Sequence, residues 1–526
     1  MRDRMLRVRV ATALVLAVSA PCANLLAQVG TRSAPRVRTA DGIVEGRLPS
    51  NGVNAFLGIP FAAPPVGTRR WQPPQPVTPW RTVRSADRFS YQCMQGRPFS
   101  DMVFRNAGTS EDCLYLNVWT PETATPGKRL PVLVYFFGGG FVAGDGSEPR
   151  YDGESMAKQG IVVVTLSYRL GIFGFLAHPE LTAESANRSA GNYGLMDQTA
   201  ALRWVRTNVA AFGGDPTRVT IAGESAGSMS VSAQMATPLA KGLFARAIGE
   251  SGALFPSGAP MATRAQAEEN GVRFAQAANA PTLAALRNLS AIEVMDLANR
   301  PGTPRFGANV DGWFFPEAPV SIYAAGRQSR VPLLAGWNSE EASWRGLTPQ
   351  PPTPDSVAAV LTRVFGARAA EASRHFPAGT NAEALRSMTD LAGDRFIGYS
   401  TWKWLETHAA TSGQPVYRYF YARPRPGATG AAHSAEIEYA MGNLAGNKVF
   451  AWTPEDQKVS TTMQQYFANF ITTGDPNGAG LPVWPTGAPT PDGATTRMRI
   501  DVNSAAEPEP TARYRFLDQA FATSPR

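Results

Sequence analysis

The run Ile-Ala-Gly-Glu-Ser-Ala-Gly-Ser at residues 221–228 places Ser225 between Gly223 and Gly227 in a G-x-S-x-G pattern, directly after an apolar run that starts at Arg218. This order is typical of a strand–turn–helix elbow, in which any side chain at the two glycines would collide with neighbouring backbone. Such an elbow presents the serine hydroxyl in a cleft, so Ser225 is a candidate nucleophile. Because a pattern with three fixed letters also arises by chance, other residues must support it.

Short, continuously apolar runs indicate strands that are buried on both faces. Such strands are typical of a mostly parallel sheet with helices on either side, which is an α/β fold. Residues 195–212 carry apolar side chains at helical spacing and complete a strand–helix–strand unit. The predicted strands are residues 131–137, 161–168, 218–222 and 331–336.

The length of 526 residues favours two or more domains by size alone. No segment has the length and polarity of a flexible linker, so we instead predict a single α/β domain over residues 28–526. Residues 260–300 and 355–412 are Ala-rich and helical in pattern. We expect them to form helical insertions that, with loops, roof the active site.

The first 27 residues combine a basic start with a short apolar stretch and small residues before Ala27, which predicts a secretory signal peptide over residues 1–27. No later segment approaches the ~20 apolar residues of a membrane span. Removing the peptide lowers the formal charge from +8 to about +5. Since no Lys/Arg run with interleaved aromatics is present, nucleic acid is not an expected partner. We expect an exported protein, periplasmic or extracellular.

Cys93 and Cys113 are the two cysteines that remain after residue 27. In an oxidising compartment an isolated pair is most simply a disulfide. Two buried free thiols are the alternative.

Several motifs in the expected order resemble the type-B carboxylesterase family of the α/β-hydrolase fold. This resemblance covers nearly the whole mature chain and implies a serine esterase that acts on small-molecule esters through an acyl-enzyme intermediate, without a cofactor or metal. The sequence gives no indication of the oligomeric state. The motifs lie at residues 56–67, 110–117, 191–198, 212–227 and 467–477.

Ester hydrolysis by a serine needs a base, a carboxylate that orients the base, and donors for the oxyanion, and in this fold the chain order is Ser, Asp or Glu, His. Of the four histidines, His178 precedes the nucleophile, and His375 and His408 lie in helical stretches where packing or surface roles are expected. His433 remains as the predicted base. The segment that follows it is similar to the family's His-x-x-Glu-Ile.

The acid should follow a strand, and the stretch after Leu333 supplies both a strand and two carboxylates, Glu340 and Glu341. Adjacent residues of an extended segment point in opposite directions, so only one of them can reach the histidine. The family register counted from Asn338 selects Glu341, although Ala342 stands where a glycine is usual.

By resemblance, the backbone amides of Gly139, Gly140 and Ala226 form the oxyanion hole. Phe137 replaces the histidine that commonly opens this glycine run, but that side chain is not a donor in the mechanism. Glu224, beside the nucleophile, either tunes the histidine or is a buried structural carboxylate. Ser251 is not an elbow nucleophile, yet it can hydrogen-bond beneath the site.

By the same resemblance, Cys93 and Cys113 form the disulfide that frames a loop over the active-site gorge. Residues 94–112 contain no Trp, which disfavours acetylcholine as the substrate, because cholinesterases carry a choline-binding tryptophan on this loop. The same residues could act on amides, carbamates or anionic polyesters. A non-catalytic binding protein is the alternative from another class, although such members of the superfamily typically lack the serine or the histidine.

Overall fold

The structure is a computed structural model that describes residues 33–256, 260–487 and 494–522. The predicted signal peptide, residues 1–27, lies outside the described residues. The internal contacts divide the chain into the units Met1–Ser33 and Ala34–Arg526, and the fold described below is that of the second unit. Within the described segments, no helix is both long and apolar enough to cross a membrane.

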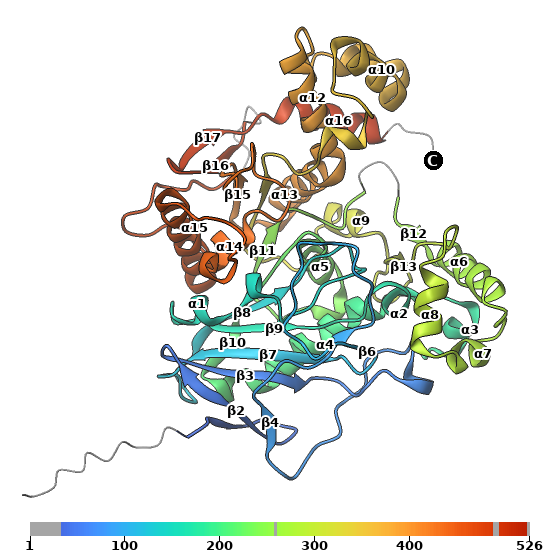
Figure 1. Cartoon of the computed structure of the whole chain (residues 1–526), viewed down its shortest axis with the longest axis vertical. Coiled ribbons are helices and arrows are strands. Elements are labelled where there is room, and N and C mark those ends of the chain that lie inside the picture. Colours follow the sequence, from blue (N-terminus) through green and yellow to red (C-terminus); the bar gives the residue numbers. More distant parts are fainter. Residues whose placement is uncertain (1–32, 257–259, 488–493, 523–526) are drawn as a thin grey trace, which may run out of the picture. The chain divides into compact units, whose positions relative to one another are not determined.

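A 13-stranded sheet, counted over the described residues, runs through this unit (Figure 1). Its central strands β9, β8, β10, β11, β14, β15 and β16 are neighbours in that order and pair in parallel, while antiparallel strands extend the sheet on both sides. The strands of this sheet are β1 (Arg36–Arg38), β2 (Ile43–Ser50), β3 (Val53–Pro60), β4 (Arg84–Ala86), β7 (Tyr115–Pro121), β8 (Leu130–Phe136), β9 (Val162–Leu166), β10 (Gly214–Glu224), β11 (Arg246–Glu250), β14 (Leu333–Asn338), β15 (Val416–Tyr421), β16 (Thr496–Ile500) and β17 (Ala505–Pro508). Two further pairs are β5 (Gln92–Cys93) with β6 (Thr109–Ser110) and β12 (Ala262–Thr263) with β13 (Asn309–Val310).

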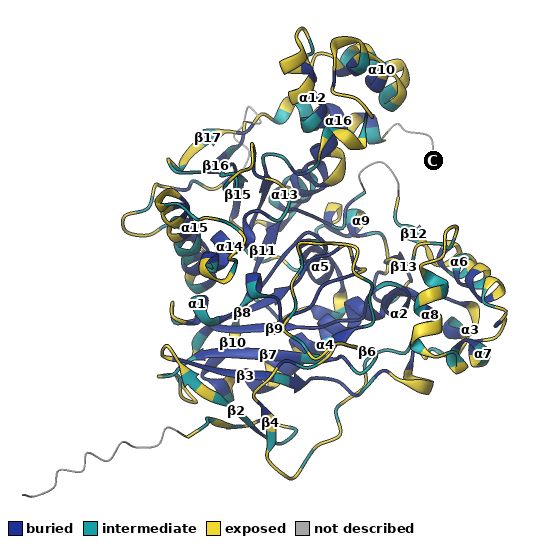
Figure 2. Ribbon diagram, in the orientation of Figure 1, coloured by how far each residue is buried: buried dark blue, intermediate teal, exposed yellow. Residues whose placement is uncertain are grey.

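The four strands predicted from apolar runs are confirmed as β8, β9, β10 and β14. Every residue of β9 and of β14 is buried, and the central strands are dark blue in Figure 2. This burial explains why the runs are continuously apolar rather than alternating.

Helices pack against the sheet. Helix α5 contacts β10 and β11, α15 contacts β8 and β10, and α13 contacts β14 and β15. The predicted α/β fold is therefore confirmed. The helices are α1 (Glu154–Ala157), α2 (Gly171–Phe175), α3 (Pro179–Glu184), α4 (Tyr193–Asn208), α5 (Ala226–Ala236), α6 (Arg264–Ala277), α7 (Leu283–Asn288), α8 (Ala291–Ala298), α9 (Pro319–Ala324), α10 (Pro354–Phe365), α11 (Ala369–Ala372), α12 (Asn381–Gly393), α13 (Tyr399–Ser412), α14 (Ile437–Met441), α15 (Pro454–Thr473) and α16 (Thr511–Ala522).

The order of the parallel strands determines where a site can form. Residues that follow neighbouring parallel strands gather at one edge of the sheet, the usual position of the site in open α/β folds. Ser225, Ser251 and the segment after Asn338 follow β10, β11 and β14, which are adjacent strands. The loop that leaves β15, the next strand, contains His433.

Candidate active site

Ser225 occupies the turn between β10 and α5, with backbone angles φ 56° and ψ −120° that non-glycine residues rarely adopt. A Cβ atom at Gly223 would lie 2.5 Å from the carbonyl oxygen of Phe136, and one at Gly227 would lie 2.0 Å from the same oxygen. Glycine is thus required on both sides of Ser225, because the turn presses against the end of β8.

The imidazole of His433 lies between Ser225 and Glu341. Its Nε2 is 2.9 Å from Ser225 Oγ, and its Nδ1 is 2.7 Å from Glu341 Oε2. In the tautomer that carries the proton on Nδ1, the imidazole donates to the carboxylate and can accept the serine proton on Nε2. The carboxyl of Glu340 lies instead against Gly430, and the backbone N–H of Glu340 donates to the carbonyl of Ala431.

The other three histidines have local roles. The Nδ1 atom of His178 accepts from the backbone N–H of Glu180 at the start of α3, and His375 stacks on Phe516. His408 is fully buried and bonds the carbonyl of Val331 through Nε2, and burial lowers its pKa to about 4.

Two further groups hold the second oxygen of the Glu341 carboxylate. Oε1 of Glu341 accepts from the backbone N–H of Asn338 at 2.6 Å and lies 2.7 Å from Ser251 Oγ. The same hydroxyl is 3.0 Å from Oε1 of Glu436, whose other oxygen accepts from the side-chain amide of Asn338. Ser251, which the sequence suggested could hydrogen-bond beneath the site, lies there.

Proton counting assigns the charge of Glu436. A single hydroxyl proton on Ser251 cannot serve two carboxylates, so one of the two carboxyls must carry a proton of its own. Burial and the carboxylates of Glu224 and Glu341 raise the pKa of Glu436 to about 8. At neutral pH Glu436 is therefore a neutral acid that donates to Ser251, and Ser251 donates to Glu341.

Glu224 lies against the opposite nitrogen of the imidazole. Its Oε1 is 3.3 Å from Nε2 of His433 and accepts from the hydroxyl of Ser434 at 2.6 Å. Burial opposes the charge on His433, but the carboxylates of Glu224 and Glu341 outweigh it and raise the pKa of this histidine to about 9. Glu224 is thus buried and also placed to stabilise an imidazolium.

A fourth carboxyl, Glu250, lies at the end of β11 and was not singled out from the sequence. It is fully buried, and neither of its oxygens has a hydrogen-bond partner among the described residues. Burial, with the neighbouring carboxyls of Glu436 and Glu224, raises its pKa well above the ordinary value, which favours the protonated form. A raised pKa at two of the four carboxyls, Glu436 and Glu250, limits the charge repulsion beneath the site.

The glycine run after β8 lies against the elbow. A Cβ atom at Gly138 would lie 3.1 Å from Cβ of Ser225, and Gly139 and Gly140 have φ values of 108° and 63°. Among the described residues, the backbone N–H groups of Gly139, Gly140 and Ala226 have no acceptor. Amides in such positions can bind a developing oxyanion.

Phe137, which replaces the usual histidine, stacks on Tyr168 with ring centroids 4.3 Å apart, and the hydroxyl of Tyr168 donates to its carbonyl. These contacts hold the start of the glycine run in place.

The predicted disulfide between Cys93 and Cys113 is present, with Cα atoms 5.0 Å apart. The loop it closes reaches the glycine run, because a Cβ at Gly139 would lie 3.0 Å from the methyl group of Met102. Gln95 is bonded to both the N–H and the carbonyl of Gly144.

Phe396 is a site residue that the sequence did not reveal. It lies in a π-helical segment, Asp394–Gly398, between α12 and α13, and its ring centroid is 5.0 Å from that of His433 in an edge-to-face arrangement. The ring is 47% exposed, so it forms an accessible wall beside the imidazole. Of the predicted helical insertions, residues 355–412 therefore reach the site.

No group of three His, Cys, Asp or Glu side chains that could hold a metal ion occurs in the described part of the chain. A serine on an elbow, an imidazole and a carboxylate at one edge of a mostly parallel sheet define a serine hydrolase of the α/β-hydrolase fold.

Comparisons with known proteins identify the family. A profile described as "Carboxylesterase family" matches residues 33–516, so the chain belongs to the carboxylesterase family and is a carboxylic-ester hydrolase. The chain is 37% identical to a fumonisin B1 esterase of Sphingopyxis macrogoltabida, over 85% of this chain and 83% of that protein. It is also 37% identical to a para-nitrobenzyl esterase of Bacillus subtilis, over 85% of this chain and 92% of that protein.

Among solved structures, a carboxylesterase of Geobacillus stearothermophilus superposes with a TM-score of 0.80 at 33% identity, covering 92% of this chain and 99% of that chain. The fold and the enzyme class predicted from the sequence are confirmed by these likenesses.

Proposed function

We propose that Ser225, His433 and Glu341 form the catalytic triad of an exported carboxylesterase that works through an acyl-enzyme. The observation that carries this proposal is the continuous line of contacts from Ser225 Oγ to His433 Nε2 at 2.9 Å and from His433 Nδ1 to Glu341 at 2.7 Å. Small-molecule esters are the substrates.

The first step requires the neutral imidazole, so its rate rises with pH toward the pKa of His433. Ser225 Oγ then attacks the ester carbonyl carbon while its proton passes to Nε2 of His433. Glu341 and Glu224 offset the imidazolium charge, and the amides of Gly139, Gly140 and Ala226 bind the oxyanion. The tetrahedral intermediate then breaks the bond to the alcohol, which leaves with the proton from Nε2. Water, deprotonated by the same nitrogen, then attacks the acyl-enzyme. The bond from the acyl carbon to Ser225 Oγ breaks, the proton on Nε2 returns to Oγ, and the acid is released.

The test is hydrolysis of p-nitrophenyl acetate by Ser225→Ala, with Ser373→Ala, an exposed serine that bonds only a backbone carbonyl, as the control. We expect turnover to disappear in the first variant and to persist in the second. Turnover by Ser225→Ala at the wild-type rate would reject the assignment. An organophosphate should label the wild type once per chain and fail to label Ser225→Ala, which separates an enzyme from a non-catalytic binding protein.

Export rests on residues 1–27. Expression of the full chain should yield protein outside the cytoplasm whose first residue is Gln28, and removal of residues 1–27 should retain it in the cytoplasm. Retention of the full chain in the cytoplasm would contradict the proposal.

A further inference from the structure

A cavity of about 970 Å³ opens beside the predicted base, and His433 and Glu341 are among the residues that line it. Its walls come from the loop after β14, from α12, from the loop before His433 and from the ends of β15 and β16. A group lying in it would be next to the imidazole whose Nε2 contacts Ser225.

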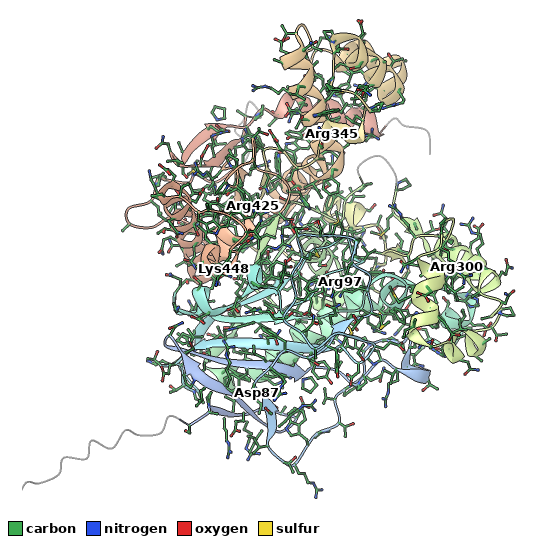
Figure 3. All side chains as sticks on the ribbon, in the orientation of Figure 1. Asp87, Arg97, Arg300, Arg345, Arg425 and Lys448 are labelled. Carbon is green, nitrogen blue, oxygen red and sulfur yellow. A yellow bond between two sulfur atoms is a disulfide. The ribbon has the colours of Figure 1, made fainter. Side chains whose placement is uncertain are left out.

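Two of the three arginines that line this cavity have no ion-pair partner among the described residues. Arg345 and Arg386 line it, are exposed, and form no ion pair within the described part of the chain. The guanidinium of Arg345 lies 4.5 Å from the ring centroid of Trp344, whose side chain also lines the cavity (Figure 3 labels Arg345). Arg499 contacts Asp501 only at 3.4 Å, on the surface.

Two of the three carboxylates that line the same cavity already have charged or hydrogen-bonding partners. Asp390 is paired with Arg513 at 2.8 Å, and Glu341 bonds His433. Glu340 has no ion pair among the described residues, and its carboxylate lies against Gly430. Two unpaired arginines, Arg345 and Arg386, therefore face one unpaired carboxylate, Glu340, so an anion that enters the cavity finds free cationic partners.

We propose that this cavity is a subsite for a carboxylate carried by the ester substrate, with Arg345 and Arg386 as its partners. The inference rests on the proposed function, since the ester carbonyl must lie at Ser225 while the carboxylate lies in the cavity. A guanidinium binds a carboxylate through two parallel N–H···O bonds, and stacking on an indole leaves those N–H edges free. The substrate class is then esters with a second, free carboxylate, such as half-esters of dicarboxylic or polycarboxylic acids.

The carboxylate can belong to the acid or to the alcohol part of the ester, and two matched substrate pairs distinguish these sources. The first pair is the 4-nitrophenyl ester of glutaric acid and its neutral monomethyl ester. The second pair is 4-acetoxybenzoate and its neutral methyl ester. The measured quantity is the ratio of kcat/KM for the anionic member to kcat/KM for the neutral member, in wild type, R345Q, R386Q and the double variant.

For one of the pairs we expect the ratio to fall about tenfold in the double variant, as expected from losing charge-assisted hydrogen bonds, while kcat/KM for the neutral ester stays within about twofold. R345K should restore part of the ratio. R300Q, which replaces an exposed arginine after α8, should leave both values unchanged (Figure 3). Since all three arginines are exposed, thermal unfolding should not change.

An unchanged ratio in the double variant for both pairs would overturn the subsite and leave the esterase proposal standing. An equal loss of kcat/KM for the anionic and the neutral esters would also overturn the subsite, because such a loss would assign the arginines a structural role. Preference of the wild type for an ester with a quaternary ammonium group would assign the cavity to Glu340 instead. A wild type that hydrolyses none of the four esters would reject the proposed function, and the subsite with it.

Discussion

Replacing Ser251 by alanine removes the hydroxyl that lies between the carboxyls of Glu341 and Glu436. The side chain is fully buried, and alanine keeps its Cβ atom and the backbone bond to Gly336. Only the contacts to the two carboxyls, at 2.7 and 3.0 Å, are lost. The variant therefore isolates the support that this hydroxyl gives to Glu341.

A hydrogen bond to a charged group contributes about 1.5–3 kcal/mol, and about 1.4 kcal/mol corresponds to a factor of ten in rate. If the contact is needed to hold Glu341 in place, kcat/KM at neutral pH should fall by roughly ten- to a hundredfold. A carboxylate with one donor fewer also holds the Nδ1 proton of His433 more strongly, so the acid limb of the pH profile should move to higher pH.

The assay is the pH dependence of kcat/KM on a p-nitrophenyl ester, with active sites counted by organophosphate titration so that unfolded protein does not contribute. Ser460→Ala is the control, because Ser460 is a buried serine that bonds only the carbonyl of Tyr439. Normalised rates within twofold of the wild type and an unmoved acid limb would refute the reasoning.

Glu436→Gln tests the inference that Glu436 is protonated at neutral pH and donates to Ser251. Glutamine can donate to Ser251 and accept from Asn338, as a protonated Glu436 does, so activity near neutral pH should stay close to that of the wild type. Above pH 8 the wild-type carboxyl ionises and the amide does not. A large loss at neutral pH would show that Glu436 acts as an anion.

Three further predictions concern other parts of the site. Glu224→Gln removes an anion that raises the pKa of His433, so the acid limb of kcat/KM should move to lower pH; an unmoved limb would contradict this electrostatic role. Gly227→Ala places a Cβ 2.0 Å from a carbonyl oxygen, and denaturant unfolding should show a loss of about 3 kcal/mol, the upper end for overpacking, while Gly307→Ala, where nothing lies within 4 Å, should be nearly neutral. Reducing the disulfide, which joins residues 20 apart, should cost about 3 kcal/mol in thermal unfolding, and an unchanged midpoint would show that the loop is held by other contacts.

The central part of the fold and the candidate residues could be predicted because their signals are local. An elbow needs glycine on both sides of Ser225, and a strand buried on both faces needs a continuous apolar run. Neighbours on an extended segment point in opposite directions, so only one of Glu340 and Glu341 could reach the histidine, and the family register counted from Asn338 selected Glu341. Each of these depends on a few consecutive residues.

The carboxyls of Glu250 and Glu436 were not predicted as part of the site, because their proximity to it depends on strand order. Ser251 and Glu250 lie at the end of β11, and only the position of β11 between β10 and β14 brings them beneath Ser225 and Glu341. A sequence does not state which strands are neighbours. Had that order been known, the position of Glu250 beneath the site would have followed from it.

Phe396 lay beyond prediction for a different reason. A π-helical turn has no sequence pattern of its own. This one begins at Asp394, whose buried side chain pairs with Arg513, a residue distant in the sequence. The sequence also could not predict that Arg345 and Arg386 lack ion-pair partners, since this depends on the side chains that surround them in the fold.

Ser225 and His433 are in contact although they are 208 residues apart in the sequence. Glu224, which precedes Ser225, and Ser434, which follows His433, are hydrogen-bonded to each other and are 210 residues apart. Partly folded chains, with only some strands assembled, cannot make this closure. Colour released from a chromogenic ester would therefore report assembly of the strands that carry these residues, which makes the enzyme its own sensor for refolding yield.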